Sequence, residues 1–252
     1  MATLREMENE LFEEWEKQYS GNFAKDGAGC NYERSKPKLL FILKETNSTD
    51  KDGKKGNYIK DIRADYLDNG MVYRTDDYRK KGSPIVQTWN KIYSWAYILL
   101  NNDSSKCQAP SDKEKRKDIF QLISTINIKK TPGVSKAVES EIRNFANDDS
   151  NKKFLSRQIK LYSPDIIICC GKGLVFELLA KSLETKPEKC FSKEGCSVYK
   201  SFCCKGDGGL TYIIDFYHPA YFGKSDEFFE KIIFEISKDL KASIPTQDHI
   251  KS

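Results

Sequence analysis

The pattern of apolar and polar positions divides the chain into helices and buried strands. Apolar residues at helical spacing predict amphipathic helices over 4–19 and from Pro84 onward. Unbroken apolar runs of strand length, typical of strands buried on both faces, occupy 38–43, 165–170 and 211–216. Further helices are predicted over 135–147, 151–162, 174–182 and 224–242, and further strands at the end of 119–128 and over 195–203. Strands that alternate with helices imply a mainly parallel sheet covered on both faces.

Two polar stretches interrupt this pattern, at about 48–83 and 101–116, and we expect both to be insertions in a single domain over 1–252. A chain of 252 residues with 38% apolar content can bury one good core. Residues 243–252 form a polar tail. The amino terminus lacks a signal-peptide pattern, and no apolar stretch reaches the roughly 18 residues of a membrane span. We therefore expect a soluble, cytoplasmic protein with no membrane partner.

Charge is nearly balanced, but the basic residues are grouped. Forty-two Lys and Arg against 37 Asp and Glu leave a net charge of +5. The basic residues gather in short runs at 51–55, 79–81, 113–117 and 129–130. One such run is typically a solvated loop, but several on one face would attract phosphate groups. Lys129 and Lys130 are candidate phosphate contacts on this basis.

The eight cysteines do not predict a metal site. Cys169 and Cys170 fall inside a predicted buried strand, where cysteine behaves as a small apolar residue. A second group has the residue types of a zinc site, but its spacing matches no familiar one. It consists of the cysteines at 190, 196, 203 and 204. We therefore expect reduced thiols and no metal.

Polar residues stand where each predicted buried strand ends. These strand ends are Lys44-Glu45-Thr46-Asn47, Asn127, Gly171-Lys172-Gly173 and His218-Pro219. In an open parallel sheet the carboxyl ends of the strands line one crevice, where ligands bind. Taken singly, each residue also has a structural explanation, such as capping a turn or satisfying loop backbone. Together they predict a functional site at one edge of the sheet.

The order and context of these segments resemble the uracil-DNA glycosylase superfamily, over about residues 37–240. The first motif is matched by Lys44-Glu45-Thr46-Asn47-Ser48, and the second by Thr125-Ile126-Asn127 ahead of Pro132. A helix–strand–glycine element ends at Gly171-Lys172, and the last motif is His218-Pro219-Ala220. The resemblance implies an α/β fold, a three-layer α/β/α sandwich with a central, mainly parallel four-stranded sheet. It also implies catalysis on DNA without a metal or an organic cofactor.

The resemblance assigns a role to each matching residue. His218 would donate a hydrogen bond to the base as negative charge develops on it. Asn127 would hold the hydrogen-bonding edge of the base, and Glu45 would orient the water or stabilise the sugar cation. Tyr221 and Phe222 would fill the space left by a flipped base, although packing at a loop end explains them equally well. No lysine is placed by a motif to form a Schiff base, so strand cleavage is not expected.

Several positions depart from the family's pattern. Lys44 stands where a glycine is usual, and Asn47 where a proline is usual. Thr46 occupies the slot of the usual water-activating residue, so Glu45 is the first candidate for that role and Asn47 the second. Ser48 replaces a tyrosine that screens out bases substituted at C5, which leaves room for a bulky C5 group. The iron–sulfur cysteines of one bacterial branch are not reproduced.

The leading hypothesis is therefore a monofunctional, monomeric DNA glycosylase acting on a C5-modified pyrimidine. Side chains of the segment 57–81, among them Tyr58, Arg63 and Tyr66, would contact a polar appendage on the base. This combination resembles antiphage glycosylases that attack glucosylated hydroxymethylcytosine in viral DNA. The DNA backbone would be held by Lys129, Lys130 and Lys172, beside Tyr221 and Phe222.

Three alternatives remain open at the level of sequence. The first is uracil repair by the same chemistry. The second is a non-catalytic nucleic-acid-binding module that keeps the fold alone. The third is a nucleotide-handling enzyme that binds phosphate at Gly171-Lys172-Gly173, although this segment lacks the spacing of a phosphate loop.

Overall fold

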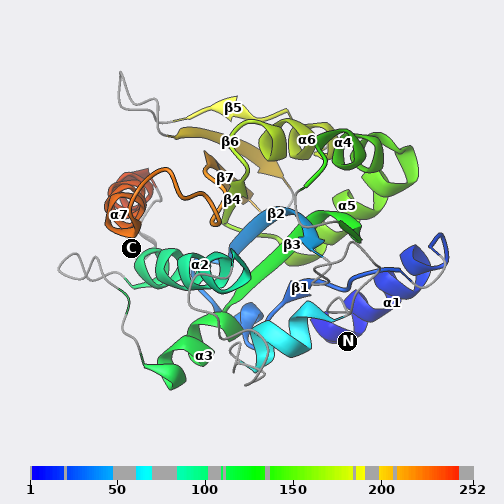
Figure 1. Cartoon of the computed structure of the whole chain (residues 1–252), viewed down its shortest axis with the longest axis horizontal. Helices are drawn as coiled ribbons and strands as arrows, with labels where there is room; N and C mark the ends of the chain where they lie inside the picture. Colours follow the sequence, from blue (N-terminus) through cyan, green and yellow to red (C-terminus); the bar gives the residue numbers. More distant parts are fainter. Residues whose placement is uncertain are drawn as a thin grey trace, which may run out of the picture.

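A single sheet runs through the molecule, and the described residues give it seven strands in the order β1-β3-β2-β4-β7-β6-β5 (Figure 1). The structure is a computed structural model that describes residues 2–19, 22–47, 61–69, 84–101, 109, 112–133, 137–183, 186–190, 199–206 and 209–243. The strands are β1 (Gly27–Ala28), β2 (Leu39–Asn47), β3 (Ile123–Gly133), β4 (Ile166–Cys170), β5 (Glu188–Lys189), β6 (Lys200–Gly206) and β7 (Gly209–Phe216). The helices are α1 (Leu4–Glu16), α2 (Pro84–Leu100), α3 (Lys113–Gln121), α4 (Glu139–Asn147), α5 (Asp149–Tyr162), α6 (Leu174–Ser182) and α7 (Asp226–Ser243). Two short turns, η1 (Tyr32–Arg34) and the π-helical η2 (Arg63–Asp68), complete the set.

The centre of the sheet is parallel and its edges are antiparallel. β2 pairs in parallel with β3 and β4, and β4 pairs in parallel with β7. β1 joins one edge and the β6–β5 pair joins the other, all antiparallel. The expected mainly parallel sheet between helices is confirmed, but the expected count of four strands is wrong, because it describes the parallel centre alone. β1 and β5 have two residues each, too few to produce a hydrophobic pattern.

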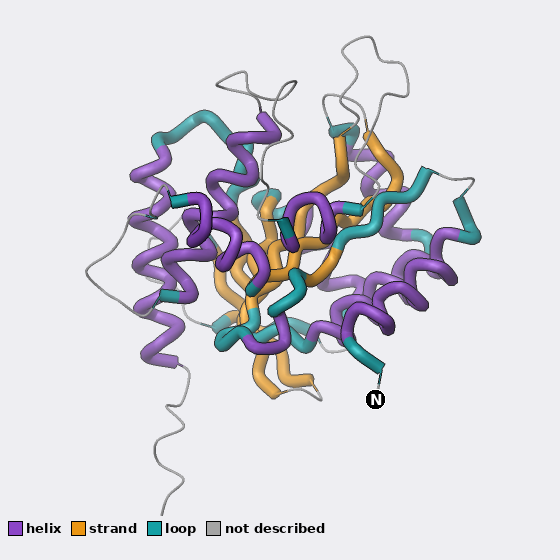
Figure 2. The backbone as a smooth tube through the Cα atoms, turned by 90° about the horizontal axis from the view of Figure 1, so that it is seen from below, coloured by secondary structure: helices purple, strands orange, loops and turns teal. Residues whose placement is uncertain are grey.

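Helices cover both faces of the sheet, which explains the unbroken apolar runs (Figures 1 and 2). Leu39, Phe41 and Leu43 of β2 face a core shared with α2 and α7. Leu40 and Ile42 face the opposite core, shared with α4, α5 and α6. A third cluster packs α1 against α5 around Trp15. Because alternate residues of one strand enter two different cores, nearly every position must be apolar.

All the predicted helices are found, most of them with shifts at their ends. The helix predicted over 174–182 is confirmed as α6. α3 begins at Lys113, inside the stretch expected to be a loop, because the Asp112 side chain caps the amides of Glu114 and Lys115. β3 runs on to Gly133, beyond residue 128, where the strand was expected to end. In the part of the chain that the structure describes, no helix is long and apolar enough to cross a membrane.

The described part of the first insertion is tied to α1 by buried charges. Arg63 is 2% exposed and its guanidinium binds Glu8 at 3.1 Å and Asp61 at 2.8 Å. Tyr66 stacks on Trp89 of α2 with ring centroids 4.6 Å apart. The Arg63 guanidinium therefore faces the interior. The expectation that it contacts an appendage on a base is wrong.

This burial predicts a stability effect for Arg63→Ala. The substitution leaves the enclosed Glu8 carboxylate without its nearest cation, and we expect it to lower the free energy of unfolding by about 3–5 kcal/mol. The matched control is Arg143→Ala, whose partners Glu139 and Glu177 are exposed, with an expected loss of at most about 1 kcal/mol. Urea unfolding of both variants measures the difference. Equal losses would contradict the structural role of Arg63.

Candidate functional site

The carboxyl ends of the four parallel strands meet at one edge of the sheet. Leu43 of β2 lies opposite Asn127 of β3, and Cys170 of β4 lies opposite Phe216 of β7. Counting two residues onward places Glu45 and His218 at the same level of this edge. One strand separates them, so their backbones are roughly 10 Å apart. The predicted histidine, carboxylate and amide therefore all lie at this edge of the sheet.

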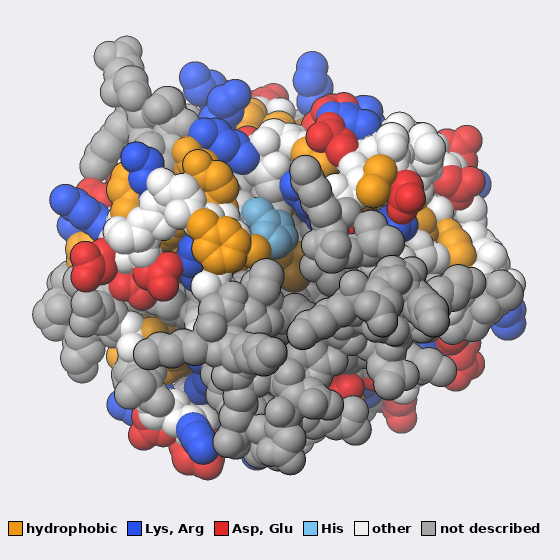
Figure 3. Space-filling view, in the orientation of Figure 1, with side chains coloured by type: hydrophobic (Ala, Val, Ile, Leu, Met, Phe, Trp, Pro, Cys, Tyr) orange, Lys and Arg blue, Asp and Glu red, His pale blue; other side chains and the backbone are white. Residues whose placement is uncertain are grey.

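His218 is held as a neutral hydrogen-bond donor. The backbone amide of Ala220 donates to His218 Nδ1 at 3.1 Å, which leaves Nε2 to carry the proton. Burial lowers the pKa of His218 to about 4, and the positive charges of Lys44 and Lys91 add to this effect. At neutral pH the imidazole is therefore uncharged, with its Nε2–H available to a ligand. Figure 3 shows this histidine, the one within the described residues, beside hydrophobic side chains and near Lys or Arg side chains.

Cationic and aromatic side chains surround His218. Lys172 donates to the Tyr217 hydroxyl at 2.8 Å and lies over its ring, 4.3 Å from the centroid. Lys91 donates to the backbone carbonyl of Tyr221 at 2.9 Å. Tyr221 and Phe222 are 43% and 62% exposed, among the most exposed large apolar side chains described. Lysine beside exposed aromatic rings is the chemistry that binds nucleic-acid backbone and bases.

Lys44 approaches the same edge from β2. A Cβ placed on Gly171 would lie 3.3 Å from Lys44 Cε, so the lysine stem passes over the glycine turn that follows β4. The same Cβ would overlap Val175 Cγ2 of α6, so this position requires glycine for the helix to approach. The turn also places the amide of Gly173 against Asp215, which accepts its hydrogen bond at 2.8 Å. Gly171 thus allows close strand–helix packing, whereas Gly173 has open space around it and a positive φ of 92°, which favours glycine in the turn.

Glu45 is enclosed and paired on one side only. Its side chain is 1% exposed, and Oε2 accepts a hydrogen bond from Lys129 Nζ at 2.8 Å. Oε1 is buried and has no partner among the described residues. A Cβ on Gly133 would overlap the Glu45 carboxyl group, so only glycine fits there. One carboxylate oxygen of Glu45 is thus free for a water or a ligand.

Lys129 serves Glu45 and is not a DNA contact. Its ammonium also binds Glu141 at 2.9 Å, and the residue is 7% exposed. Burial alone would lower the pKa of Lys129, but the hydrogen bonds to Glu45 and Glu141 outweigh it and the pKa is raised. The ammonium is therefore protonated and already occupied by two carboxylates. The expectation of a phosphate contact is corrected accordingly.

Lys130 is fully buried, which excludes its predicted contact with DNA. Its ammonium pairs with Asp26, which is also fully buried, and lies 5.2 Å from the centroid of the Trp15 ring. Burial lowers the pKa of Lys130, against the pull of Asp26. Successive side chains of a strand point in opposite directions. A basic pair in sequence therefore did not become a basic surface.

Asn127 is held by two residues. Asp26 Oδ2 accepts from the Asn127 backbone amide at 2.7 Å and from its side-chain Nδ2 at 3.2 Å. Nδ2 also donates to the Thr46 hydroxyl at 3.2 Å. Asp26 carries no sequence signal, since Lys25-Asp26-Gly27 looks like an ordinary turn. Its role arises from contacts to residues about a hundred positions away.

The remaining predicted site residues divide into two groups. Ser48 and Tyr58 lie outside the described residues. Asn47 ends β2 opposite Gly133, and its side chain lies outside them as well. Tyr66 packs its ring against the α2 core. The structure thus brings together His218, Glu45, Thr46 and Asn127, and adds Asp26, Lys44 and Lys91.

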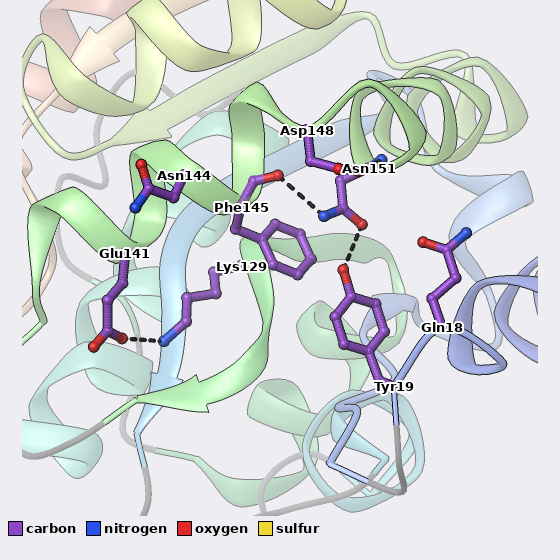
Figure 4. Close-up of a pocket in the computed structure, with 8 residues that line it drawn as sticks. All are labelled: Gln18, Tyr19, Lys129, Glu141, Asn144, Phe145, Asp148 and Asn151. Carbon is purple, nitrogen blue, oxygen red and sulfur yellow. Dashed lines mark hydrogen bonds and ion pairs between the residues drawn. The ribbon is translucent and has the colours of Figure 1, made fainter.

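A cavity of about 510 Å³ adjoins the site on the side of α1, α4 and α5 (Figure 4). Lys129 lines it and points toward Glu141, while Tyr19 and Phe145 stack with centroids 5.7 Å apart. His218 and Asn127 do not line this cavity. It is therefore a neighbour of the site on the far side of Lys129.

The arrangement supplies complementary charges for breaking a polar bond. A neutral N–H donor at His218 can stabilise negative charge on a leaving group. An enclosed carboxylate at Glu45 can orient a water or stabilise positive charge.

Among the described residues, no three His, Cys, Asp or Glu side chains gather as a metal site. No protein-family model matches the chain, and no curated protein matches its sequence.

The lowered pKa of His218 predicts how stability depends on pH. Above pH 6.5 the histidine is neutral in both states, and between 6.5 and about 4 mainly the unfolded chain takes up the proton. The protein therefore loses stability relative to His218→Gln as pH falls through this window, by up to about 3 kcal/mol. Urea unfolding at pH 4.5, 5.5 and 7.5 measures the difference in the free energy of unfolding between the parent protein and this variant. A difference that stays constant with pH would contradict a neutral, buried His218.

Proposed function

We propose that the protein is a monofunctional DNA glycosylase that hydrolyses the N-glycosidic bond of a flipped, C5-modified cytosine and leaves an abasic site. The single observation that supports the proposal is the neutral His218, whose Nδ1 accepts the Ala220 amide and which follows β7 at the edge of the sheet where Glu45 and Asn127 also lie. The proposal includes membership of the uracil-DNA glycosylase superfamily, which rests on the four motifs at the strand ends. Glucosylated hydroxymethylcytosine in phage DNA is the proposed base, with antiviral defence as the role.

In the proposed reaction the base leaves as an anion. The C1′–N1 bond breaks, its electron pair goes to the base, and positive charge develops on the sugar. The Nε2–H of His218 donates a hydrogen bond to the base oxygen, and the cations of Lys44 and Lys91 stabilise the same negative charge. The Glu45 carboxylate stabilises the sugar cation and orients the water that adds to C1′. The proton lost by this water ends on the released base.

The exposed side chains beside His218 fit the proposed DNA contact. Phe222 and Tyr221 are placed to enter the stack where the nucleotide has left it. Lys172 lies beside them on the Tyr217 ring, within reach of phosphate. With Lys129 and Lys130 excluded, the proposed DNA surface lies around the end of β7.

The first insertion returns to the Asn127 side of the site. β2 ends at Asn47, and the chain is next described at Asp61, which forms a parallel bridge with Lys25. Ile62 donates its amide to the carbonyl of Lys25 at 2.7 Å. Lys25 precedes Asp26, the residue that holds Asn127. An insertion anchored there supports the proposal that it contacts a substituent on the base.

We expect the protein to produce abasic sites in phage DNA that carries glucosylated hydroxymethylcytosine, and His218→Ala to slow base release by about 100- to 1,000-fold. DNA retention by the variant should change little, because His218 acts mainly on the developing charge. The control variant is His249→Ala, in the polar tail. Alkali-labile sites are scored on this DNA, on uracil-containing DNA and on unmodified DNA.

Each pattern of cleavage has a separate meaning. Cleavage of uracil-containing DNA alone would replace the proposal with uracil repair. Retention of DNA with no cleavage of any of the three would replace it with a non-catalytic binding module of the same fold.

The free Oε1 of Glu45 generates a second expectation. Glu45→Gln keeps the size of the side chain but removes the negative charge, and we expect base release to fall about 100-fold. Glu141→Gln is the matched control, since it removes the other carboxylate that binds Lys129. The Glu141 side chain is 57% exposed. Single-turnover rates separate the two variants. Similar losses in both would assign Glu45 to structure and not to chemistry.

A further inference from the structure

The hydrogen-bonding capacity of Asn127 is almost entirely used within the protein. A side-chain amide offers two N–H donors and one carbonyl acceptor. Both donors have partners, Asp26 Oδ2 and Thr46 Oγ1, each at 3.2 Å. The carbonyl Oδ1 is buried and has no partner among the described residues. Asn127 can therefore accept a hydrogen bond from a ligand but cannot donate one.

The orientation of this amide is forced by Asp26. A carboxylate only accepts hydrogen bonds, so the nitrogen of Asn127 must face it. Four donors converge on the two oxygens of Asp26: the backbone amide and Nδ2 of Asn127, Lys130 Nζ, and Gln158 Nε2 at 3.1 Å. Turning the Asn127 amide over would place its carbonyl oxygen against the Asp26 carboxylate, two acceptors with no proton between them, in a fully buried setting.

Asp26, with Lys130 and Gln158 bound to it, forms a clamp on Asn127 that joins several elements. Gln158 of α5 also donates to the Asp26 carbonyl at 3.2 Å and to the Tyr162 hydroxyl at 2.9 Å. Lys130 comes from β3, as Asn127 does. Asp26, Lys130 and Gln158 are all fully buried. A ligand at the sheet edge therefore meets an amide whose direction was set before binding.

Two pyrimidines differ in what they present to such an acceptor. Cytosine carries an amino group at C4, which donates, whereas uracil and thymine carry O4, which accepts. An amino group satisfies the unpaired Oδ1 of Asn127. A uracil brings O4 against another oxygen, or meets Oδ1 with N3–H and leaves O4 without a donor from Asn127.

We infer that Asp26 is a positioning residue that, together with Thr46, fixes Asn127 as an acceptor and so gives the site its preference for a base with an amino group at C4. The inference rests on the proposed glycosylase function and specifies which edge of the base that site selects. Asp26 acts through Asn127 and does not itself touch the base. Thr46 is the point at which the clamp can be loosened, because its hydroxyl holds one of the two amide hydrogens.

The test uses two DNAs that differ only at C4 of one base, glucosylated 5-hydroxymethylcytosine and glucosylated 5-hydroxymethyluracil. The measured quantity is the ratio of kcat/KM for the two. We expect the protein to favour the cytosine by about 10- to 100-fold, the discrimination of one good polar contact. Thr46→Val keeps the side-chain shape, frees one N–H of Asn127 to donate to O4, and should lower this ratio at least about threefold.

Two further variants separate specificity from stability. Thr211→Val is the matched control, because its hydroxyl donates to the Pro164 carbonyl at 2.8 Å at the opposite end of the strands, and its ratio should equal that of the parent protein. Asp26→Leu removes both acceptor oxygens but would leave Lys130 buried without its counter-ion, so it is combined with Lys130→Met. This double variant should also lose preference for the cytosine.

The outcomes distinguish the two levels of the proposal. A cytosine preference that falls in Thr46→Val and in the double variant, but not in Thr211→Val, supports the role of Asp26. A preference for the uracil, an unchanged ratio in Thr46→Val, or an equal shift in Thr211→Val overturns that role and leaves the glycosylase function standing. Cleavage of neither DNA overturns both.

Discussion

The buried ion pair between Asp26 and Lys130 is the interaction on which the candidate site depends. Both groups are fully enclosed, and such a pair is tolerated only when every remaining hydrogen-bonding position is filled. Here the amides of Asn127 and Gln158 fill the remaining positions on Asp26, and the Trp15 ring lies beside the Lys130 ammonium. Because the buried Asp26 carboxylate needs donors, it fixes the direction of the Asn127 side chain at the edge of the sheet. The carboxylate that pairs with Lys130 therefore also sets the direction of the Asn127 amide.

The parallel centre of the fold was predictable because burial on both faces leaves an unmistakable pattern. The runs over 38–43, 165–170 and 211–216 each became a central strand, and α6 has the predicted bounds. The edges were not predictable in the same way. β1 and β5 are two residues long and owe their pairing to strands that come later in the chain, β3 and β6. The start of α3 at Lys113 depends on a single capping aspartate within a polar stretch.

The location of the site was more predictable than its details. The rule that parallel strands end at one edge placed Glu45, Asn127 and His218 together, because it depends on the backbone alone. It says nothing about side-chain direction, and so Lys129 and Lys130 were assigned to DNA although both are paired inside the protein. Asp26 was missed for a related reason. It contacts Asn127 across 101 positions of sequence, a distance over which local pattern carries no information.

The bridge between Lys25 and Asp61 has a consequence for how this protein can change over time. The segment that leaves β2 at Asn47 has both ends secured by backbone pairing, to β3 at one end and to Lys25 at the other. Lengthening a tethered segment is inexpensive, since each doubling adds roughly 0.6 kcal/mol of closure entropy. We therefore expect the chain between Asn47 and Asp61 to vary in length and sequence at little cost to the free energy of folding.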